Sequence, residues 1–206
     1  MMKKLKVWLV SLLCIATFLI ASPVLADRIA EKSPDYPIVV ENLNALLTLK
    51  SDPQQTEYTP EELKQAISEL EFQKYVLETS EDWGICRNET GKNLAIYARN
   101  QKKATPNTLF YLGDGQETDD NWDCEAVYIP NDVNVASLEL PDGQPSAVRI
   151  LDGTNLTIST NPDTGELLLD APSALIEVVD ATDTTLSIPN VTQTEIDAQV
   201  ANAPID

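Results

Sequence analysis

The chain has 206 residues, with 14 basic and 33 acidic side chains and a formal net charge of −19. Nucleic-acid binding depends on Lys and Arg, so such an excess of carboxylates excludes nucleic acid as a partner. The sequence contains no histidine, and this excludes Ser-His-Asp catalysis, Cys-His catalysis and the usual zinc hydrolases, because all of them need an imidazole.

Residues 1–26 have the pattern of a secretory signal peptide. Three lysines precede an apolar run over residues 7–21, and small residues stand before Asp27. The run of about 15 residues is shorter than the ~20 that a spanning helix needs. We therefore expect export to the periplasm or the extracellular space, with no integral membrane span after cleavage. A retained N-terminal anchor is the alternative.

Two helices are expected before residue 80. Residues 27–58 are expected to be loosely structured, with one short helix at 38–50 where apolar residues recur at helical spacing. The stretch from Thr59 to Glu62 is a capping box with proline at the first helical position, and an amphipathic pattern follows it. This pattern predicts a second helix over residues 60–78.

From Trp83 onward, short apolar or alternating runs are separated by Asp-Gly and Asn-Pro turn signals. They predict strands at 94–98, 109–112, 125–129, 133–135, 137–140, 147–151, 156–160, 167–169, 175–179 and 185–188. The predicted fold class is α+β, with short N-terminal helices followed by a mainly antiparallel β-sandwich or barrel-like domain. We expect one domain over residues 59–191 and an acidic C-terminal tail over 192–206, in which Thr192 begins another capping box.

Cysteine usage agrees with export. Removal of the signal would leave Cys86 and Cys124 as an even pair in an oxidising compartment, where a disulfide is expected. Closing that loop would stabilise the fold by roughly 4 kcal/mol in the chain-entropy model. Two free thiols are the alternative.

The most acidic stretch lies between Gly113 and Glu125. Its carboxylates suit calcium, which prefers several closely spaced oxygen ligands. The spacing does not match an EF-hand loop, because an aspartate occupies the position that requires glycine. A calcium site and a solvated loop beside the Cys124 bridge both remain open, and the pattern favours the loop. The candidate calcium ligands are Asp114, Glu117, Asp119, Asp120 and Asp123.

Two tryptophans are placed in predicted loops. Trp83 and Trp122 are candidates for stacking against a ligand such as a sugar ring. Packing over the Cys86–Cys124 link is the simpler explanation of both, since large aromatic side chains stabilise folds mainly by burial.

The expected function is that of an exported, acidic, soluble binding or interaction protein of the cell envelope or extracellular space, without a catalytic role or a resident cofactor. Its partner is expected to be a protein, a glycan or a cation. A small carboxylate-dependent glycan hydrolase and a calcium-dependent envelope protein are the alternatives. Hydrolysis would require converging carboxyl groups in a cleft, at least one with a strongly raised pKa.

Overall fold

The computed structural model describes residues 29–51, 58–180, 182 and 185–205, so the predicted signal peptide at 1–26 lies outside it. The described chain is α+β: two N-terminal helices are followed by one three-stranded and one five-stranded sheet, and these sheets do not close into a barrel. None of the helices in these ranges has the length and apolar character needed to cross a membrane.

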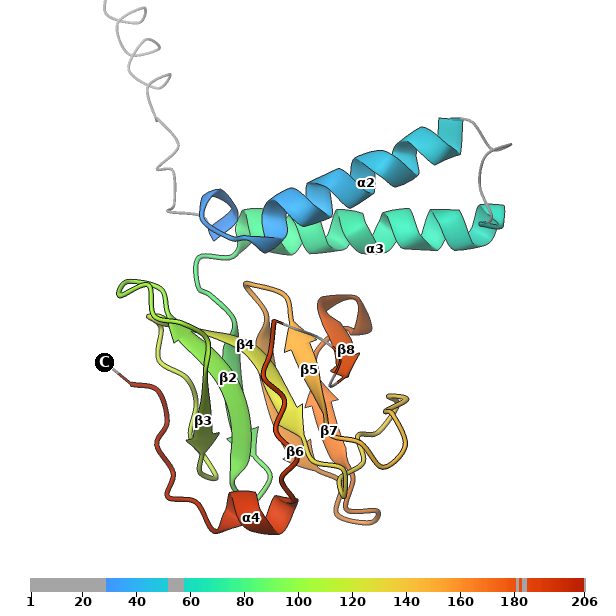
Figure 1. Cartoon of the computed structure of the whole chain (residues 1–206). Coiled ribbons are helices and arrows are strands. Elements are labelled where there is room, and N and C mark those ends of the chain that lie inside the picture. The colour runs from blue at the N-terminus through green and yellow to red at the C-terminus, as the bar shows by residue number, and fades with distance from the viewer. Residues whose placement is uncertain (1–28, 52–57, 181, 183–184, 206) are drawn as a thin grey trace, which may run out of the picture.

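The helices form an antiparallel hairpin above the β domain (Figure 1). A short 3-10 turn, η1 (Ile29–Glu31), precedes α2 (Asp35–Ser51) and α3 (Pro60–Thr79). The capping box before α3 is present in full, and the predicted helix is confirmed to within one residue. Helix α2 starts three residues earlier than predicted, because Pro37 stands in the first turn, where its missing N–H breaks no helical hydrogen bond.

The hairpin has its own small core. Leu43 of α2 is buried against Leu63 and Ile67 of α3. At the end nearer to the β domain, Ile29 and Leu77 belong to a second buried group that also contacts the strands' connecting segments. The hairpin is therefore held both by helix-to-helix packing and by contact with the β domain.

The three-stranded sheet has the order β1-β6-β7 and the five-stranded sheet β3-β2-β4-β5-β8. Strands β1 and β6 pair in parallel, and the other pairs are antiparallel. The prediction of a mainly antiparallel β domain is confirmed. The strands are β1 (Ile85–Glu89), β2 (Leu94–Asn100), β3 (Thr108–Leu112), β4 (Trp122–Ile129), β5 (Ser146–Ile150), β6 (Asn155–Thr160), β7 (Leu167–Asp170) and β8 (Ile176–Asp180).

Three predicted strands are wrong, and one real strand was not predicted. Residues 133–140 form turns and a single bridge, and residues 185–188 join neither sheet. These segments are loops whose apolar side chains, such as Val135 and Leu186, are buried in the core. A loop that buries its apolar residues in this way has the same sequence pattern as a short strand. Strand β1 escaped prediction because three of its five side chains are polar.

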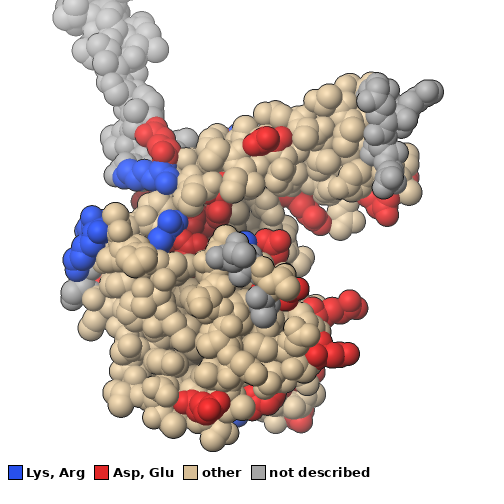
Figure 2. Space-filling model, in the orientation of Figure 1, with Lys and Arg blue, Asp and Glu red and all other residues tan. Residues whose placement is uncertain are grey.

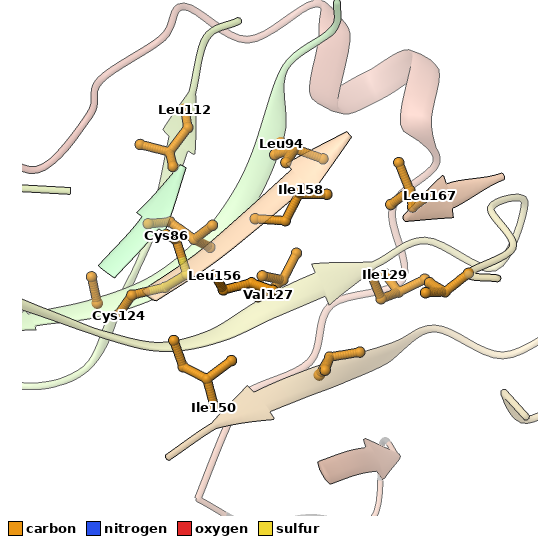
Figure 3. Close-up of a cluster of buried hydrophobic side chains, with 14 residues drawn as sticks. Cys86, Leu94, Leu112, Cys124, Val127, Ile129, Ile150, Leu156, Ile158 and Leu167 are labelled. Atoms are coloured by element: carbon orange, nitrogen blue, oxygen red, sulfur yellow. A yellow bond between two sulfur atoms is a disulfide. The ribbon is translucent and has the colours of Figure 1, made fainter. Parts of the chain in front are cut away.

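The main core lies between the two sheets (Figure 3), which pack face to face. The opposite face of the five-stranded sheet is covered by the C-terminal segment and by α4 (Gln193–Asp197), which starts at the predicted capping box. Two tyrosines attach this cover: Tyr97 donates to the Ser187 carbonyl at 2.8 Å, and Tyr128 donates to the Val191 carbonyl at 2.8 Å. The central strands β2 and β4 are therefore buried on both faces.

Candidate functional site

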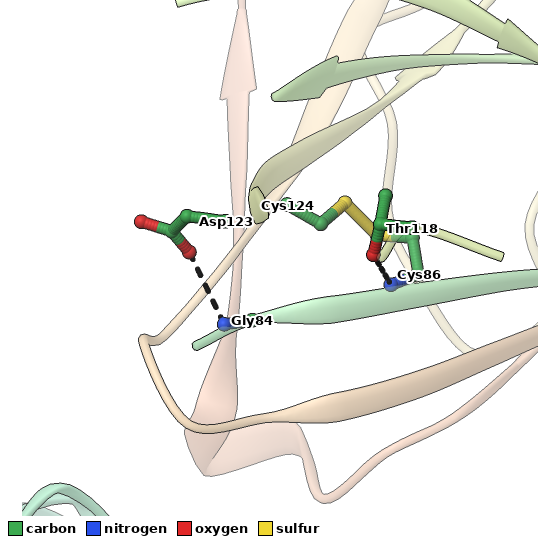
Figure 4. The surroundings of a disulfide bond; sticks show 5 residues. All are labelled: Gly84, Cys86, Thr118, Asp123 and Cys124. Atoms are coloured by element: carbon green, nitrogen blue, oxygen red, sulfur yellow. Dashed lines mark hydrogen bonds between the residues drawn. A yellow bond between two sulfur atoms is a disulfide. The ribbon is translucent and has the colours of Figure 1, made fainter. Parts of the chain in front are cut away.

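The predicted disulfide is confirmed. Cys86 of β1 and Cys124 of β4 are bonded, with their Cα atoms 5.8 Å apart, and both are fully buried (Figure 4). The bond joins the two sheets at their core, and the Cys86 amide also donates to the Thr118 hydroxyl at 3.2 Å. A buried disulfide of this kind indicates an oxidising, extracytoplasmic compartment.

The predicted calcium ligands are not gathered around a common point. Asp114 accepts a hydrogen bond from the Gly91 amide at 2.9 Å. Glu117 forms an ion pair with Arg87 at 2.9 Å. Asp123 is buried at the other end of the stretch. Across the part of the chain that the structure describes, no three His, Cys, Asp or Glu side chains form a group able to hold a metal ion. The geometry gives the calcium prediction no support.

The two tryptophans pack at the margins of buried clusters. Trp122 begins β4 and stands edge-on to Phe110, with ring centroids 5.1 Å apart and planes at 77°. Trp83 packs against the group around Ile29 and Leu77. Both indoles are half-buried. Trp122 packs against the cluster that contains Cys86 and Cys124, whereas Trp83 packs against a different cluster and not over the disulfide.

A group of four carboxylates converges where the helical hairpin meets the β domain. Asp35 comes from the start of α2, Asp123 and Glu125 from β4, and Asp152 from the turn that follows β5. The guanidinium of Arg99, from β2, lies among them. We call these four side chains the carboxylate cluster. Only Asp123 was among the predicted site residues, and it was assigned there to calcium.

Two of these groups contact one arginine beside a β-bulge in β4. The register of β4 against β2 shifts between Tyr97 and Ala98, so Glu125 becomes an extra residue on β4 and Asp123 stands opposite Arg99. Arg99 Nη2 then lies 3.1 Å from the Asp123 Oδ2, and its Nε lies 2.5 Å from the Glu125 Oε1.

The side chain of Asp123 is fully buried and fully hydrogen-bonded. Its Oδ1 accepts the Gly84 N–H at 3.1 Å (Figure 4), and its Oδ2 also accepts the Gln101 side-chain amide at 2.6 Å. Gly84 allows this close approach, because a Cβ at that position would lie 2.5 Å from the Cys124 carbonyl oxygen. Asp123 therefore acts as a structural anchor beside the disulfide.

Asp152 connects the N-terminal segment to the β domain. Its Oδ2 accepts the Ser33 hydroxyl at 2.5 Å, and its backbone amide donates to the Asp35 Oδ2 at 3.2 Å. The next residue, Gly153, has φ +83°, and a Cβ there would lie 2.7 Å from the Ser80 hydroxyl. The helical hairpin is thus seated on the turn after β5 by direct polar contacts and a close backbone approach.

Burial and mutual repulsion change the protonation of the cluster. Burial raises the pKa of Asp152 to about 9, and the neighbouring Asp123 and Asp35 carboxylates add to this. Burial, with repulsion from Asp123, also raises the pKa of Glu125 to about 7. The pKa of Asp35 is raised by burial as well. Asp152 and Glu125 therefore both hold a proton more tightly in the folded chain than a free carboxyl group does.

Beside the cluster lies a groove of about 460 Å³ between the hairpin and the edge of the five-stranded sheet. One wall consists of α2 and α3, and the other consists of β5, η3 (Ser173–Leu175) and β8. We call it the junction groove. Its lining includes apolar Ile38, Val39 and Leu70 and acidic Asp35, Glu69 and Glu177. Figure 2 shows acidic side chains on both sides of the notch below the helices.

Asp35 is the member of the carboxylate cluster that also lines the junction groove. The other three members are held by the contacts described above, inside the junction. The arrangement therefore has two chemical consequences. Titratable side chains hold the helical hairpin against the β domain, and an acidic, partly apolar groove lies beside these contacts.

Comparison with known proteins supplies no further assignment. No protein-family model, no curated protein and no solved structure matches the chain.

Proposed function

We propose that this chain is an exported binding protein that holds its partner in the junction groove. The observation that supports this most is the groove itself. Its volume of about 460 Å³ falls within the ~300–1,000 Å³ of known ligand sites, and its lining combines apolar with polar and charged side chains. The groove lies between two separately packed units, where binding sites are commonly found.

Two features support export. The sequence begins with a signal-like segment, and the disulfide is of the kind that persists outside the cytoplasm. We propose that the mature chain acts in the periplasm or the extracellular space. There its carboxylates keep it soluble and bias it towards basic partners.

Carboxylate-dependent glycan hydrolysis is the second candidate. Glu69 of α3 and Glu177 of β8 line opposite walls of the groove, and retaining or inverting hydrolysis needs two such groups. If these carboxylates act on a polysaccharide, release of reducing ends is lost in both Glu69→Gln and Glu177→Gln. Binding without any such release favours the first proposal.

Site-specific photo-crosslinking tests the binding function. A photoreactive residue is placed at Asn42, which lines the groove and is exposed, and in a second variant at Asp163, an exposed residue of the β6–β7 turn that is not part of the groove lining. Both full-length variants are expressed in cells that export the protein. The proposal predicts a discrete adduct from position 42 that position 163 does not give. Equal labelling from both positions, or none from position 42, contradicts it.

A further inference from the structure

Three of the four sheet edges are already hydrogen-bonded to loop segments. The edge of β3 is closed by Asn202, whose N–H donates to the Tyr111 carbonyl at 2.9 Å and whose side-chain oxygen accepts the Tyr111 N–H at 2.7 Å. In the same way, backbone hydrogen bonds join the edge of β1 to segment 115–118 and the edge of β7 to segment 134–136. Covering edges in this manner prevents unwanted strand pairing.

The outer edge of β8 differs from these three. The Leu151 amide donates to the Leu175 carbonyl at 2.9 Å, so these two residues form a hydrogen-bonded pair of the antiparallel β5–β8 ladder. Along such a ladder, hydrogen-bonded and non-hydrogen-bonded pairs alternate. The alternation directs the backbone groups of Glu177 and Val179 towards β5, and those of Val178 away from it. Within the described ranges, no backbone group pairs with the outward N–H and C=O of Val178. As far as the described residues go, this edge is therefore left for pairing with another strand.

The open edge leads directly into the junction groove. Ile176 and Glu177, at the start of β8, line the groove. Across from them on α2, Ile38 is 57% exposed although it is a large apolar side chain. A segment added to β8 alternates its side chains between two directions, so the residues of that segment beside Ile176 and Glu177 can direct side chains into the groove.

The charges of the lining favour a basic segment. Asp35, Glu69 and Glu177 contribute carboxylates from three different elements. The basic residue in the lining, Arg149, already lies 3.9 Å from Glu177 and donates to the Thr185 hydroxyl at 2.5 Å. Complementary charge speeds association and discriminates against acidic partners. A lysine or arginine entering the groove meets carboxylates from both walls.

From these contacts we infer that the partner is a basic, extended polypeptide segment that pairs with β8 as an additional strand and places cationic side chains, from its part beside Ile176 and Glu177, in the junction groove. This inference rests on the proposed function, since it specifies the partner of the same groove. Main-chain hydrogen bonds to Val178 supply affinity, and the acidic lining supplies selectivity.

The test uses fluorescence anisotropy with a labelled octapeptide in which lysine alternates with valine, and with the matching peptide in which glutamate replaces lysine. Val178→Pro removes the outward N–H while leaving the ladder to β5 intact, as proline is tolerated at such edge positions. Val178→Thr keeps that N–H and serves as the matched control. Circular dichroism and thermal melts of both variants confirm that each is folded.

The lysine peptide is expected to bind the native protein and the glutamate peptide is not. Val178→Pro should weaken binding by about tenfold, the effect of losing one or more interchain hydrogen bonds, while Val178→Thr stays within about twofold. Glu69→Gln with Glu177→Gln should weaken binding and flatten its salt dependence.

Equal binding to the proline and threonine variants overturns the strand pairing. If the lysine peptide does not bind while position 42 still crosslinks to some other molecule, the inference fails and the binding function stands. If neither the peptide nor any crosslinked partner is found, both fail.

Discussion

Ser33 and Asp152 are separated by 119 residues in the sequence, yet the Ser33 hydroxyl donates to the Asp152 Oδ2 at 2.5 Å in a buried contact. The same Ser33 oxygen accepts the Asp35 amide at 3.1 Å. One hydroxyl therefore links the start of α2 to the turn after β5. The junction groove lies beside this contact, so its shape depends on it.

Ser33→Ala is expected to lower the free energy of unfolding by about 1–2 kcal/mol, because the buried Asp152 carboxyl loses its hydroxyl donor. Urea unfolding measures the change. Ser68→Ala, at an exposed position of α3, is the matched control and should change stability by less than about 0.5 kcal/mol. Equal effects of the two substitutions would show that the Ser33 contact does not stabilise the junction.

The stability of the native protein should fall as the pH rises from 5 to 8. Burial raises the pKa of Glu125 to about 7 and that of Asp152 to about 9, while both ionise near pH 4 in the unfolded chain. The folded state therefore binds more protons between these values, and its stability is lost as the pH increases. We expect a loss of about 1–3 kcal/mol, measured by chemical unfolding at each pH. A rising profile would contradict the raised pKa values.

Asp152→Asn should stabilise the protein at pH 8, by about 1–3 kcal/mol, and have little effect at pH 4. Asparagine resembles the neutral carboxyl and keeps an oxygen that accepts the Ser33 hydroxyl, but it has no proton to lose on unfolding. Asp142→Asn, at an exposed turn position, is the control. We expect it to change the free energy of unfolding equally little at pH 4 and at pH 8. A variant that is less stable than the native protein at pH 8 would mean that Asp152 is ionised in the fold.

Gly84→Ala should be strongly destabilising, by about 1–3 kcal/mol or more, because the new methyl group would lie 2.5 Å from the Cys124 carbonyl oxygen. Gly113→Ala is the control: there the nearest atom, at 3.2 Å, is the end of the flexible Gln116 side chain. Thermal melts compare the two. Similar melting temperatures would show that the backbone at Gly84 can move aside at little cost.

The sequence predicted those parts of the fold that depend on local signals. The capping boxes at Thr59 and Thr192 start helices where expected, because the cap and its partner are three residues apart. The disulfide followed from the even number of cysteines and the expected compartment. The strands at 133–140 and 185–188 were wrong because a loop that buries its apolar side chains has the same alternation as a strand.

The carboxylate cluster and the junction groove could not be predicted in this way. Asp35, Asp123, Glu125 and Asp152 come from three separate parts of the chain, which are brought together only in the folded structure. The acidic stretch suggested a metal site, yet Asp123 serves the disulfide region and Arg99 instead. A period-2 pattern shows which face a residue occupies and not which distant turn lies against that face.

Amide hydrogen exchange at Val178 tests whether β8 accepts a strand at its outer edge. The measurement is made on the full protein with and without saturating lysine–valine octapeptide. We expect exchange of the Val178 amide to slow by about tenfold or more when the peptide is bound. Exchange of the Tyr111 amide, which already donates to Asn202, should not change. Unchanged exchange at Val178 in the presence of demonstrably bound peptide would contradict strand pairing at β8.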